Sequence, residues 1–261
     1  MESIDSLQET ATHGLANTTP ALFLIQNIHT SFCKILYLGN MKKYFSLALI
    51  LSFLILTAQD WRQLGRYQKD NAKILEQEKT VNTVFFGDSI TQDWASFNPV
   101  FFEENAFLGR GISGQTTPQL LLRFRQDVLS FQPKRVVLLA GINDIAENTG
   151  PITLEETVGN IISMAEIAKS NGIEMILCSV LPANYFPWQP KIIPTLKVID
   201  LNKRLRLYAQ ENDLTYVDYY STMVDQKKGL KSELGYDTVH PNKSGFDIME
   251  KILLKALKEK E

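Results

Sequence analysis

The stretch "VFFGDSITQDW", residues Val84 to Trp94, contains the feature that decides the fold. It begins as a run of apolar residues, stops at Gly87 and continues directly with Asp88 and Ser89. A strand that is apolar at every position is typical of a parallel sheet, where both faces are buried. Gly, Asp and Ser are also the residues of turns and helix caps, so one interpretation is a turn before a helix. The other interpretation is a nucleophilic serine at the tip of a buried strand.

Further strand-like runs alternate with helical patterns along the chain. A weaker run follows at 106–112, the clearest is "RVVLLAG" at 135–141, and two more lie at 174–181 and 214–220. This alternation predicts an α/β fold, a three-layer α/β/α sandwich with a roughly five-stranded parallel sheet of the flavodoxin-like kind.

Helix signals separate these runs. Residues 60–79 carry apolar side chains at helical spacing among charges, which predicts an amphipathic lead-in helix. Thr117 before Pro118 is typical of a helix N-cap and first position, and Thr153 with Glu156 has the pattern of a capping box. The terminal helix is expected to bury four apolar residues at spacings of three and four: Phe246, Met249, Leu253 and Leu257.

Composition excludes several classes of protein. The chain has 261 residues, 44% of them hydrophobic, and a formal net charge of −2. This is enough length for one good core, and the near-neutral balance gives no electrostatic footprint for nucleic acid. There is no glycine-rich phosphate loop, and Cys33 and Cys178 have no metal-ligand spacing. The sequence therefore predicts no cofactor and no metal.

The N-terminal region has a different character. Residues 41–58 consist of a start methionine, two lysines, an apolar stretch and a small-residue end at Ala58, which is the pattern of a secretory signal peptide. Residues 1–40 are then interpreted as an upstream over-extension or an unstructured segment, and 59–261 as the exported domain, periplasmic or secreted. Because Gln59 is not a cysteine, the pattern does not support a lipoprotein. An uncleaved signal that anchors the chain to the membrane is the alternative.

Polar residues recur after the strand-like runs and before the terminal helix. The segments are "GRGISGQTT" at 109–117, "AGINDIAENTG" at 140–150 and "YDTVHPN" at 236–242. In open parallel sheets, sites lie beyond the carboxyl ends of the strands, so these loops and Ser89 are expected to lie close together.

A serine becomes a nucleophile when a base takes its proton and a third group orients that base. His240 is the one histidine left when the N-terminal His13 and His29 are set aside, and Asp237 lies three residues before it. A lone histidine is more often structural, but this acid can accept the Nδ1 proton and leave Nε2 for a serine.

The tetrahedral intermediate of such a reaction needs hydrogen-bond donors for its oxyanion. Three groups qualify: the backbone N–H of Ser89, the backbone N–H of Gly114 and the side-chain amide of Asn143. The alternative for Gly114 is a simple turn glycine, and for Asn143 a helix or turn cap. Asp88 is expected to fix the turn at Ser89 by accepting from local backbone N–H groups.

These segments resemble a known family. "GDSIT", "GRGISGQTT", "GIND" and "DTVH" stand in the order of the four blocks of the SGNH (GDSL) hydrolase superfamily, over roughly residues 80–258. The resemblance implies a five-stranded parallel sheet, with Ser89 as nucleophile, Asp237 and His240 completing the triad, and Gly114 and Asn143 as oxyanion donors. The chain looks most like single-domain esterases similar to platelet-activating-factor acetylhydrolases and carbohydrate acetylesterases.

The segment "SVLPANYFPWQPKIIPT" at 179–195 contains four prolines and several aromatic residues. One interpretation is a rigid loop over the core. The other is a pocket wall in which Tyr185 and Trp188, together with Trp94, stack on a sugar or cover a short acyl chain.

The sequence therefore predicts a serine esterase for acetyl-type esters, with a small ester or acylated carbohydrate as its partner. It predicts no nucleic acid and no membrane insertion after signal cleavage, and leaves the oligomeric state open. Two alternatives remain. One is a lysophospholipase or thioesterase for longer acyl chains, and the other is a non-catalytic glycan-binding protein on a hydrolase scaffold.

Overall fold

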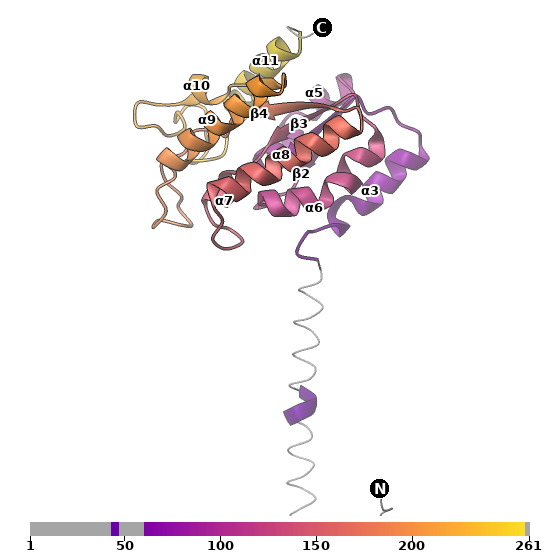
Figure 1. Ribbon diagram of the computed structural model, residues 1–261, viewed down its shortest axis with the longest axis horizontal. Coiled ribbons are helices and arrows are strands. Elements are labelled where there is room, and N and C mark those ends of the chain that lie inside the picture. The colour runs from indigo at the N-terminus through magenta and orange to yellow at the C-terminus, as the bar shows by residue number, and fades with distance from the viewer. Residues whose placement is uncertain (1–42, 47–59, 259–261) are drawn as a thin grey trace, which may run out of the picture. The chain divides into compact units, whose positions relative to one another are not determined.

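The computed structural model describes residues 43–46 and 60–258 (Figure 1). Residues 43–46 are helical, and the expectations for residues 1–40 and for the rest of the signal segment lie outside the described residues. The chain divides at residue 60 into two units, of which the second, beginning at Trp61, contains the sheet. No helix in the described ranges is long and apolar enough to cross a bilayer.

A five-stranded parallel sheet forms the centre of residues 61–258, in the order β2-β1-β3-β4-β5. The strands are β1 (Thr83–Gly87), β2 (Phe107–Gly111), β3 (Arg135–Leu139), β4 (Glu174–Cys178) and β5 (Thr215–Val217). The five-stranded α/β sandwich expected from the sequence is confirmed. Each strand corresponds to one of the strand-like runs. β1 ends at Gly87, where its run ends, and the other four strands end one to three residues before their runs do.

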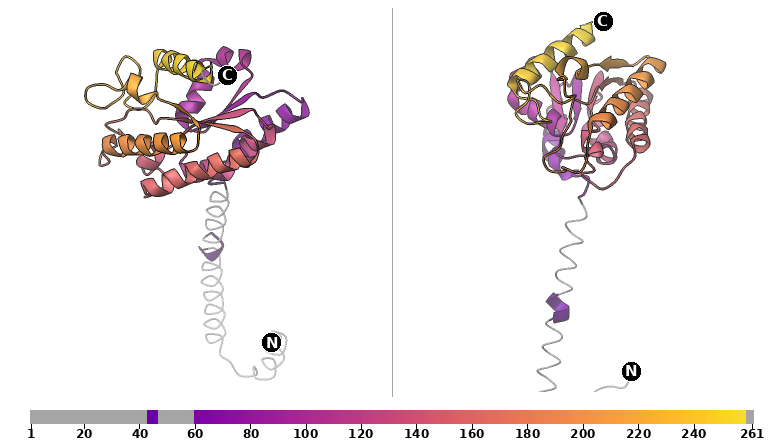
Figure 2. Two further views of the ribbon diagram at one scale, coloured as in Figure 1. Left: turned by 45° about the horizontal axis from the view of Figure 1, so that its top comes forward. Right: turned by 90° about the vertical axis from the view of Figure 1, so that its left-hand side faces the viewer.

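Helices cover both faces of this sheet (Figure 2). Alternate residues of a strand point to opposite faces, so Val84 and Phe86 of β1 enter one core and Phe85 enters the other. The first core contains residues of α6 (Thr117–Asp127), η1 (Leu129–Phe131), α7 (Ile142–Ile145), α8 (Leu154–Ser170) and α9 (Thr195–Glu211). The second contains residues of α4 (Ser89–Phe97), α5 (Pro99–Glu104), α10 (Tyr220–Met223) and α11 (Lys243–Lys258).

The helix boundaries agree with most of the sequence signals. The lead-in helix is α3 (Gly65–Glu76). Thr153 and Glu156 form the expected capping box at the start of α8, with the Glu156 N–H donating to Thr153 Oγ1 at 3.1 Å. Helix α11 buries the four expected residues, Phe246, Met249, Leu253 and Leu257.

The expected cap of α6 was wrong by one residue. Thr116 is the N-cap, and its backbone N–H donates to Gln119 Oε1 at 3.0 Å. The hydroxyl of Thr117 is occupied elsewhere, since it donates to Asp144 Oδ1 at 2.5 Å. This second contact ties the start of α6 to the loop after β3.

Candidate active site

The site loops begin at the carboxyl ends of β1, β2 and β3, where the strand order reverses. From β1 the chain passes to β2 on one side and then to β3 on the other. In this strand order the switch point between β1 and β3 is where doubly wound proteins bind ligands. The register sets Gly87 beside Gly111 and Leu139, so the three loops leave the sheet at one level.

Ser89 is the first residue of α4 and lies directly beyond β1. Asp88 is the N-cap, and its Oδ1 accepts from the Ile90 N–H at 3.0 Å, as expected from the sequence. The sharp turn requires a close backbone approach at the end of β2. A Cβ atom on Gly111 would stand 2.2 Å from the Gln92 nitrogen and 2.5 Å from the Asp88 carbonyl oxygen. Only glycine leaves room there for the start of α4.

The structure brings Ser89, His240 and Asp237 into one chain of hydrogen bonds. Ser89 Oγ lies 3.0 Å from His240 Nε2, and His240 Nδ1 lies 2.8 Å from Asp237 Oδ2. The other carboxylate oxygen of Asp237 accepts from the backbone N–H groups of Val239, at 2.7 Å, and His240, at 2.6 Å. This geometry can transfer a proton from the serine to an imidazole that is oriented by a carboxylate.

The local hydrogen bonds keep Asp237 charged. Burial by itself raises the pKa of this carboxyl, but the hydrogen bonds from the His240 and Val239 backbones and from the imidazole more than offset burial and lower the pKa. The ring of Tyr236 stacks on the imidazole of His240, with centroids 5.5 Å apart and planes 8° apart. The orientation of the imidazole is therefore fixed by an acid on one side and a flat ring on another.

Asp88 has the opposite environment. It is fully buried, and its Oδ2 has no hydrogen-bond partner within the described part of the chain. Burial raises its pKa to about 7, against the smaller lowering effect of the Ile90 N–H. Asp88 thus acts on the backbone of the turn and does not contact His240 through a hydrogen bond.

Gly114 and Asn143 flank the serine. Gly114 has a φ of +75°, and an added Cβ would meet nothing within 4 Å, so its constraint is conformational. Asn143 Nδ2 donates to the Gln115 carbonyl at 3.0 Å, which leaves its second hydrogen for another acceptor. Asn143 does not cap its own helix, since the N-cap of α7 is Gly141. Within the described residues, the N–H groups of Ser89 and Gly114 have no acceptor.

A cavity of about 270 Å³ joins these groups. Its lining residues are Ser89, Ser113, Gly114, Asn143, Asn148, Trp188, Val239 and His240. Of the three aromatic residues that were expected to form a wall, only Trp188 lines the cavity. Tyr185 is half-exposed outside it, and its carbonyl accepts from the Thr238 hydroxyl at 3.0 Å.

The expectation for Trp94 was wrong. Trp94 is 1% exposed and packs in the core between the sheet and α11. Its ring contacts Phe85 edge-on at 5.2 Å and stacks on Phe246 at 5.8 Å, while Nε1 donates to Glu250 Oε1 at 3.0 Å. Trp94 follows Ile90 by four positions, so both lie on the inner face of α4, and neither reaches the cavity.

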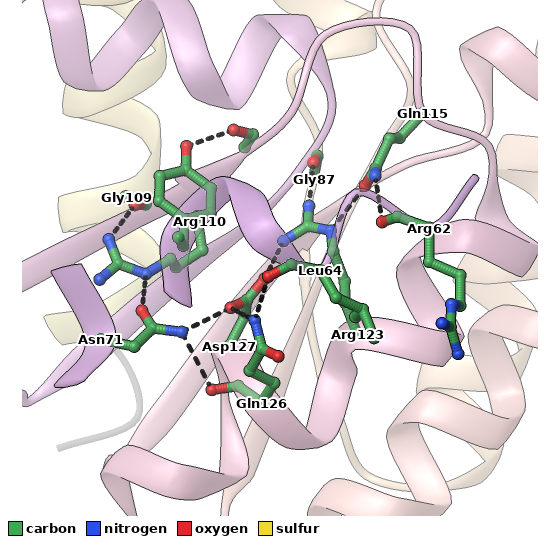
Figure 3. A network of polar contacts seen from close by, with 12 residues as sticks. Arg62, Leu64, Asn71, Gly87, Gly109, Arg110, Gln115, Arg123, Gln126 and Asp127 are labelled. Carbon is green, nitrogen blue, oxygen red and sulfur yellow. Dashed lines mark hydrogen bonds and ion pairs between the residues drawn. The ribbon is translucent and has the colours of Figure 1, made fainter. Parts of the chain in front are cut away.

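A network of buried hydrogen bonds and ion pairs connects the ends of the strands with the loops of the site (Figure 3). Arg123, on α6, is fully buried and contacts the ring of Phe86 at 4.2 Å. Its Nη2 donates to the Gly87 carbonyl at 2.8 Å, and its Nε donates to Gln115 Oε1 at 2.5 Å. Its Nη1 pairs with Asp127 at 2.9 Å. One guanidinium therefore connects the strand end before Ser89 with the residue after Gly114.

The lead-in segment joins the same network. Asn71 of α3 donates to Asp127 Oδ1 at 2.7 Å, and the Arg62 carbonyl accepts from Gln115 at 3.0 Å. Sequence analysis missed Arg123 and Gln115 as supporting residues, and it also missed Asn148 and Tyr236 at the site. Among the described residues there is no group of three or more His, Cys, Asp or Glu that could hold a metal ion.

The order of the strands and the polar loops at the switch point define the class of this protein. It is an α/β protein with a small cavity at the carboxyl edge of its sheet. Comparison with known proteins identifies the family. Residues 85–248 match the GDSL-like lipase/acylhydrolase family, and the chain belongs to it. The protein is accordingly an enzyme that hydrolyses ester bonds, an esterase or acylhydrolase.

Solved structures share the fold. A GDSL-like lipase from Bacteroides thetaiotaomicron is 44% identical, with a TM-score of 0.73, over 77% of this chain and 100% of that chain. An acetylxylan esterase from Geobacillus stearothermophilus shares the fold at 18% identity, with a TM-score of 0.55 over 68% of this chain and 95% of that chain.

A sequence relative was also found. An uncharacterized lipoprotein of Bacillus subtilis, YqeF, is 30% identical over 118 residues, which are 39% of this chain. The match spans about half of that relative's length, 49%.

Proposed function

We propose that the protein is a serine esterase that removes acetyl or other short acyl groups, with Ser89 as nucleophile, His240 as base and Asp237 as the orienting acid. The single observation that carries the proposal is the hydrogen-bond chain from Ser89 Oγ to His240 Nε2, at 3.0 Å, and from His240 Nδ1 to Asp237, at 2.8 Å. It lies at the cavity, beside two further groups that can stabilise an oxyanion.

The proposed reaction has two stages. Ser89 Oγ attacks the ester carbonyl while its proton passes to His240 Nε2, and the carbonyl oxygen becomes an oxyanion. The N–H groups of Ser89 and Gly114 and the amide of Asn143 donate to that oxyanion. The leaving alcohol takes the proton from His240. Water then attacks the acyl-serine, with His240 as base again, and releases the acid.

The size of the cavity supports a short acyl group. At about 270 Å³ it is slightly smaller than the usual range for ligand pockets, roughly 300–1,000 Å³. Ser113, Asn143 and Asn148 give it a polar lining, and Trp188 is its large apolar member. A long alkyl chain would leave the cavity and lie in water.

We also propose that the alcohol part of the substrate is a carbohydrate. Trp188 is 44% exposed and Tyr236 is 54% exposed, and both rings stand next to the imidazole of His240. Flat aromatic faces beside His240 suit the apolar face of a sugar ring. The acetylxylan esterase of the same fold acts on such esters, which is compatible with this proposal.

Export is the remaining part of the proposal. The signal pattern of residues 41–58 and the relative that is named a lipoprotein both support an exported protein. We expect a mature N-terminus near Gln59. N-terminal sequencing of the exported protein tests this, and peptides from residues 1–40 in the mature protein would contradict it.

The activity test uses p-nitrophenyl esters of increasing chain length, from acetate through butyrate and octanoate to laurate. We expect kcat/KM to be highest for the shortest esters, and Ser89→Ala to lower kcat by roughly 10⁴ or more. Ser96→Ala is the matched control, because Ser96 is an exposed serine on the same helix. Activity of Ser89→Ala within tenfold of the wild type would contradict the serine mechanism. Preference for laurate would favour the longer-chain alternative.

A further inference from the structure

The side-chain amide of Asn143 can present two different atoms to the cavity. An amide group keeps its shape when it turns by 180°, but the turn exchanges a donor N–H₂ for an acceptor oxygen. An oxyanion is stabilised by the first and repelled by the second. The orientation of this amide therefore decides whether Asn143 assists or opposes the reaction.

Two neighbours set that orientation. The Gln115 carbonyl can only accept, and it lies 3.0 Å from Asn143 Nδ2. On the other side, Asn148 Nδ2 donates to Asn143 Oδ1 at 2.7 Å. The Asn148 backbone N–H also donates to the Asn143 carbonyl at 3.1 Å, so the loop returns onto Asn143 through two bonds.

The side chain of Asn148 is also an amide, so its own orientation must be fixed before its nitrogen can donate to Asn143. Trp188 fixes this orientation, because its Nε1–H lies 3.1 Å from Asn148 Oδ1 and an indole nitrogen can only donate. Donation from Trp188 points the oxygen of Asn148 toward the indole and its nitrogen toward Asn143. The direction of each bond is thus determined by the two ends of the chain of bonds: the indole N–H of Trp188 can only donate, and the carbonyl of Gln115 can only accept.

Trp188 is held by its own loop, which follows β4. Its ring stacks on the buried Phe186, with centroids 5.2 Å apart and planes 28° apart. Pro187 and Pro190 stand close to it on either side in the sequence. This loop provides none of the three groups of the proposed triad, yet it is connected to the proposed oxyanion donor.

We propose that Asn148 is a positioning residue that holds the amide of Asn143 with its N–H₂ group toward the cavity, and that Trp188 holds Asn148 in the orientation this requires. The proposal rests on the oxyanion role of Asn143 in the proposed function. Because Asn148 accepts a bond from the indole and donates one to Asn143, the chain also polarises the Asn143 amide and strengthens its N–H as a donor.

The decisive variant is Asn148→Asp. A carboxylate can accept from Trp188 but cannot donate to Asn143 Oδ1. It instead attracts Asn143 Nδ2 and turns the donor away from the cavity. We expect kcat to fall by about 100-fold, approaching the loss in Asn143→Ala, while KM changes little. Asn148→Ala removes the bond without reversing it, and should lower kcat only about 5–10-fold, since Asn148 is exposed and water replaces part of the bond.

Trp188→Phe tests the second bond. It keeps an aromatic ring against Phe186 and removes the N–H, so we expect kcat to fall about 2–5-fold in the wild-type background. In the Asn148→Ala background the same change should lower kcat by a smaller factor than in the wild type, because the bond between Trp188 and Asn148 is already absent. Asn171→Asp is the matched control for the change of charge, since Asn171 is an exposed asparagine at the end of α8.

The outcomes separate the two proposals. If Asn143→Ala lowers kcat and Asn148→Asp stays within twofold of the wild type, the positioning role is wrong and the oxyanion role stands. A Trp188→Phe effect of equal size in both backgrounds also overturns the positioning role. If Asn143→Ala itself keeps normal kcat, both roles fail. Thermal unfolding of each variant confirms that kcat refers to folded protein.

Discussion

Ser89 Oγ lies 3.0 Å from His240 Nε2, although 151 positions separate the two residues in the chain. They meet because α4 begins at the carboxyl end of β1 and the loop before α11 returns over that edge of the sheet. The proposed acid and base, in contrast, come from one short turn, Asp237 to His240, which its own backbone N–H groups hold together. The sheet thus supplies the proposed nucleophile, and a local turn supplies its base.

The first prediction concerns pH. The pKa of Asp237 is held below its ordinary value of 3.8, so its carboxylate stays charged throughout the neutral range. Protonation of Asp237 should therefore not lower kcat/KM anywhere between about pH 5 and 8. Asp237→Asn should lower kcat by as much as about 10⁴. Pre-steady-state and steady-state ester hydrolysis measure both effects.

The partly exposed Asp247 on α11 gives the control for that variant, since Asp247→Asn removes a carboxylate that pairs with Lys243. Normal turnover in Asp237→Asn while Ser89 remains essential would mean that another group orients the imidazole.

The second prediction concerns Asn143. Asn143→Ala should lower kcat by roughly 10²–10³ with little change in KM, because in the proposed mechanism the amide donates to charge that develops only in the transition state. The variant also leaves the Gln115 carbonyl and the Asn148 amide without their partner, so a loss of stability of about 1–3 kcal/mol is expected as well. Turnover is therefore measured well below the Tm of the variant. An early Tm combined with normal kcat would remove Asn143 from the reaction.

Much of this architecture could be predicted from the sequence because its signals are local. Apolar strand runs that end on glycine, and polar loops after them, are visible without any contact information. The topology of a parallel sheet then brings Ser89, Gly114 and Asn143 to one edge.

The missed features depend on long-range packing. The direction in which Trp94 points follows from how α4 rotates against β2 and α11, which no local pattern gives. Asn148 returns to Asn143 through Glu147, whose φ of +56° is rare for a residue with a side chain. Arg123 carries a charge, and charged side chains are mostly exposed, so its burial depends on acceptors from β1 and the loop after β2.

The third prediction concerns the buried Asp88. Burial raises its pKa to about 7, whereas the unfolded chain has the ordinary value of 3.8. Between these values the native state holds a proton that the unfolded state has released, so the free energy of unfolding falls as the pH rises. An asparagine in place of the acid would have no proton to lose. The Tm of Asp88→Asn relative to that of the wild type should therefore increase from about pH 5 to about pH 8. The increase should be about 2–4 °C for each kcal/mol of unfolding free energy that the wild type loses.

Thermal unfolding of both proteins at about pH 5 and about pH 8 measures this change in the Tm difference. Asp247→Asn, at a partly exposed position, should show no such trend. A Tm difference between Asp88→Asn and the wild type that stays constant with pH would contradict the buried, protonated state of Asp88.

The last prediction separates two buried arginines of one network, Arg123 and Arg110 (Figure 3). Arg123 bonds to the Gly87 carbonyl and Gln115, whereas Arg110 bonds to Asn71, Asp70 and its neighbour's carbonyl. Removing either guanidinium leaves buried polar groups unpaired, so Arg123→Met and Arg110→Met should both lower stability, by about 3–5 kcal/mol for the fully buried pair of Arg123. Only Arg123→Met should also lower kcat when both variants are assayed well below their Tm, because only Arg123 holds the strand end before Ser89 and the loop after Gly114. Equal kcat in the two folded variants would show that the network stabilises the fold without positioning the site.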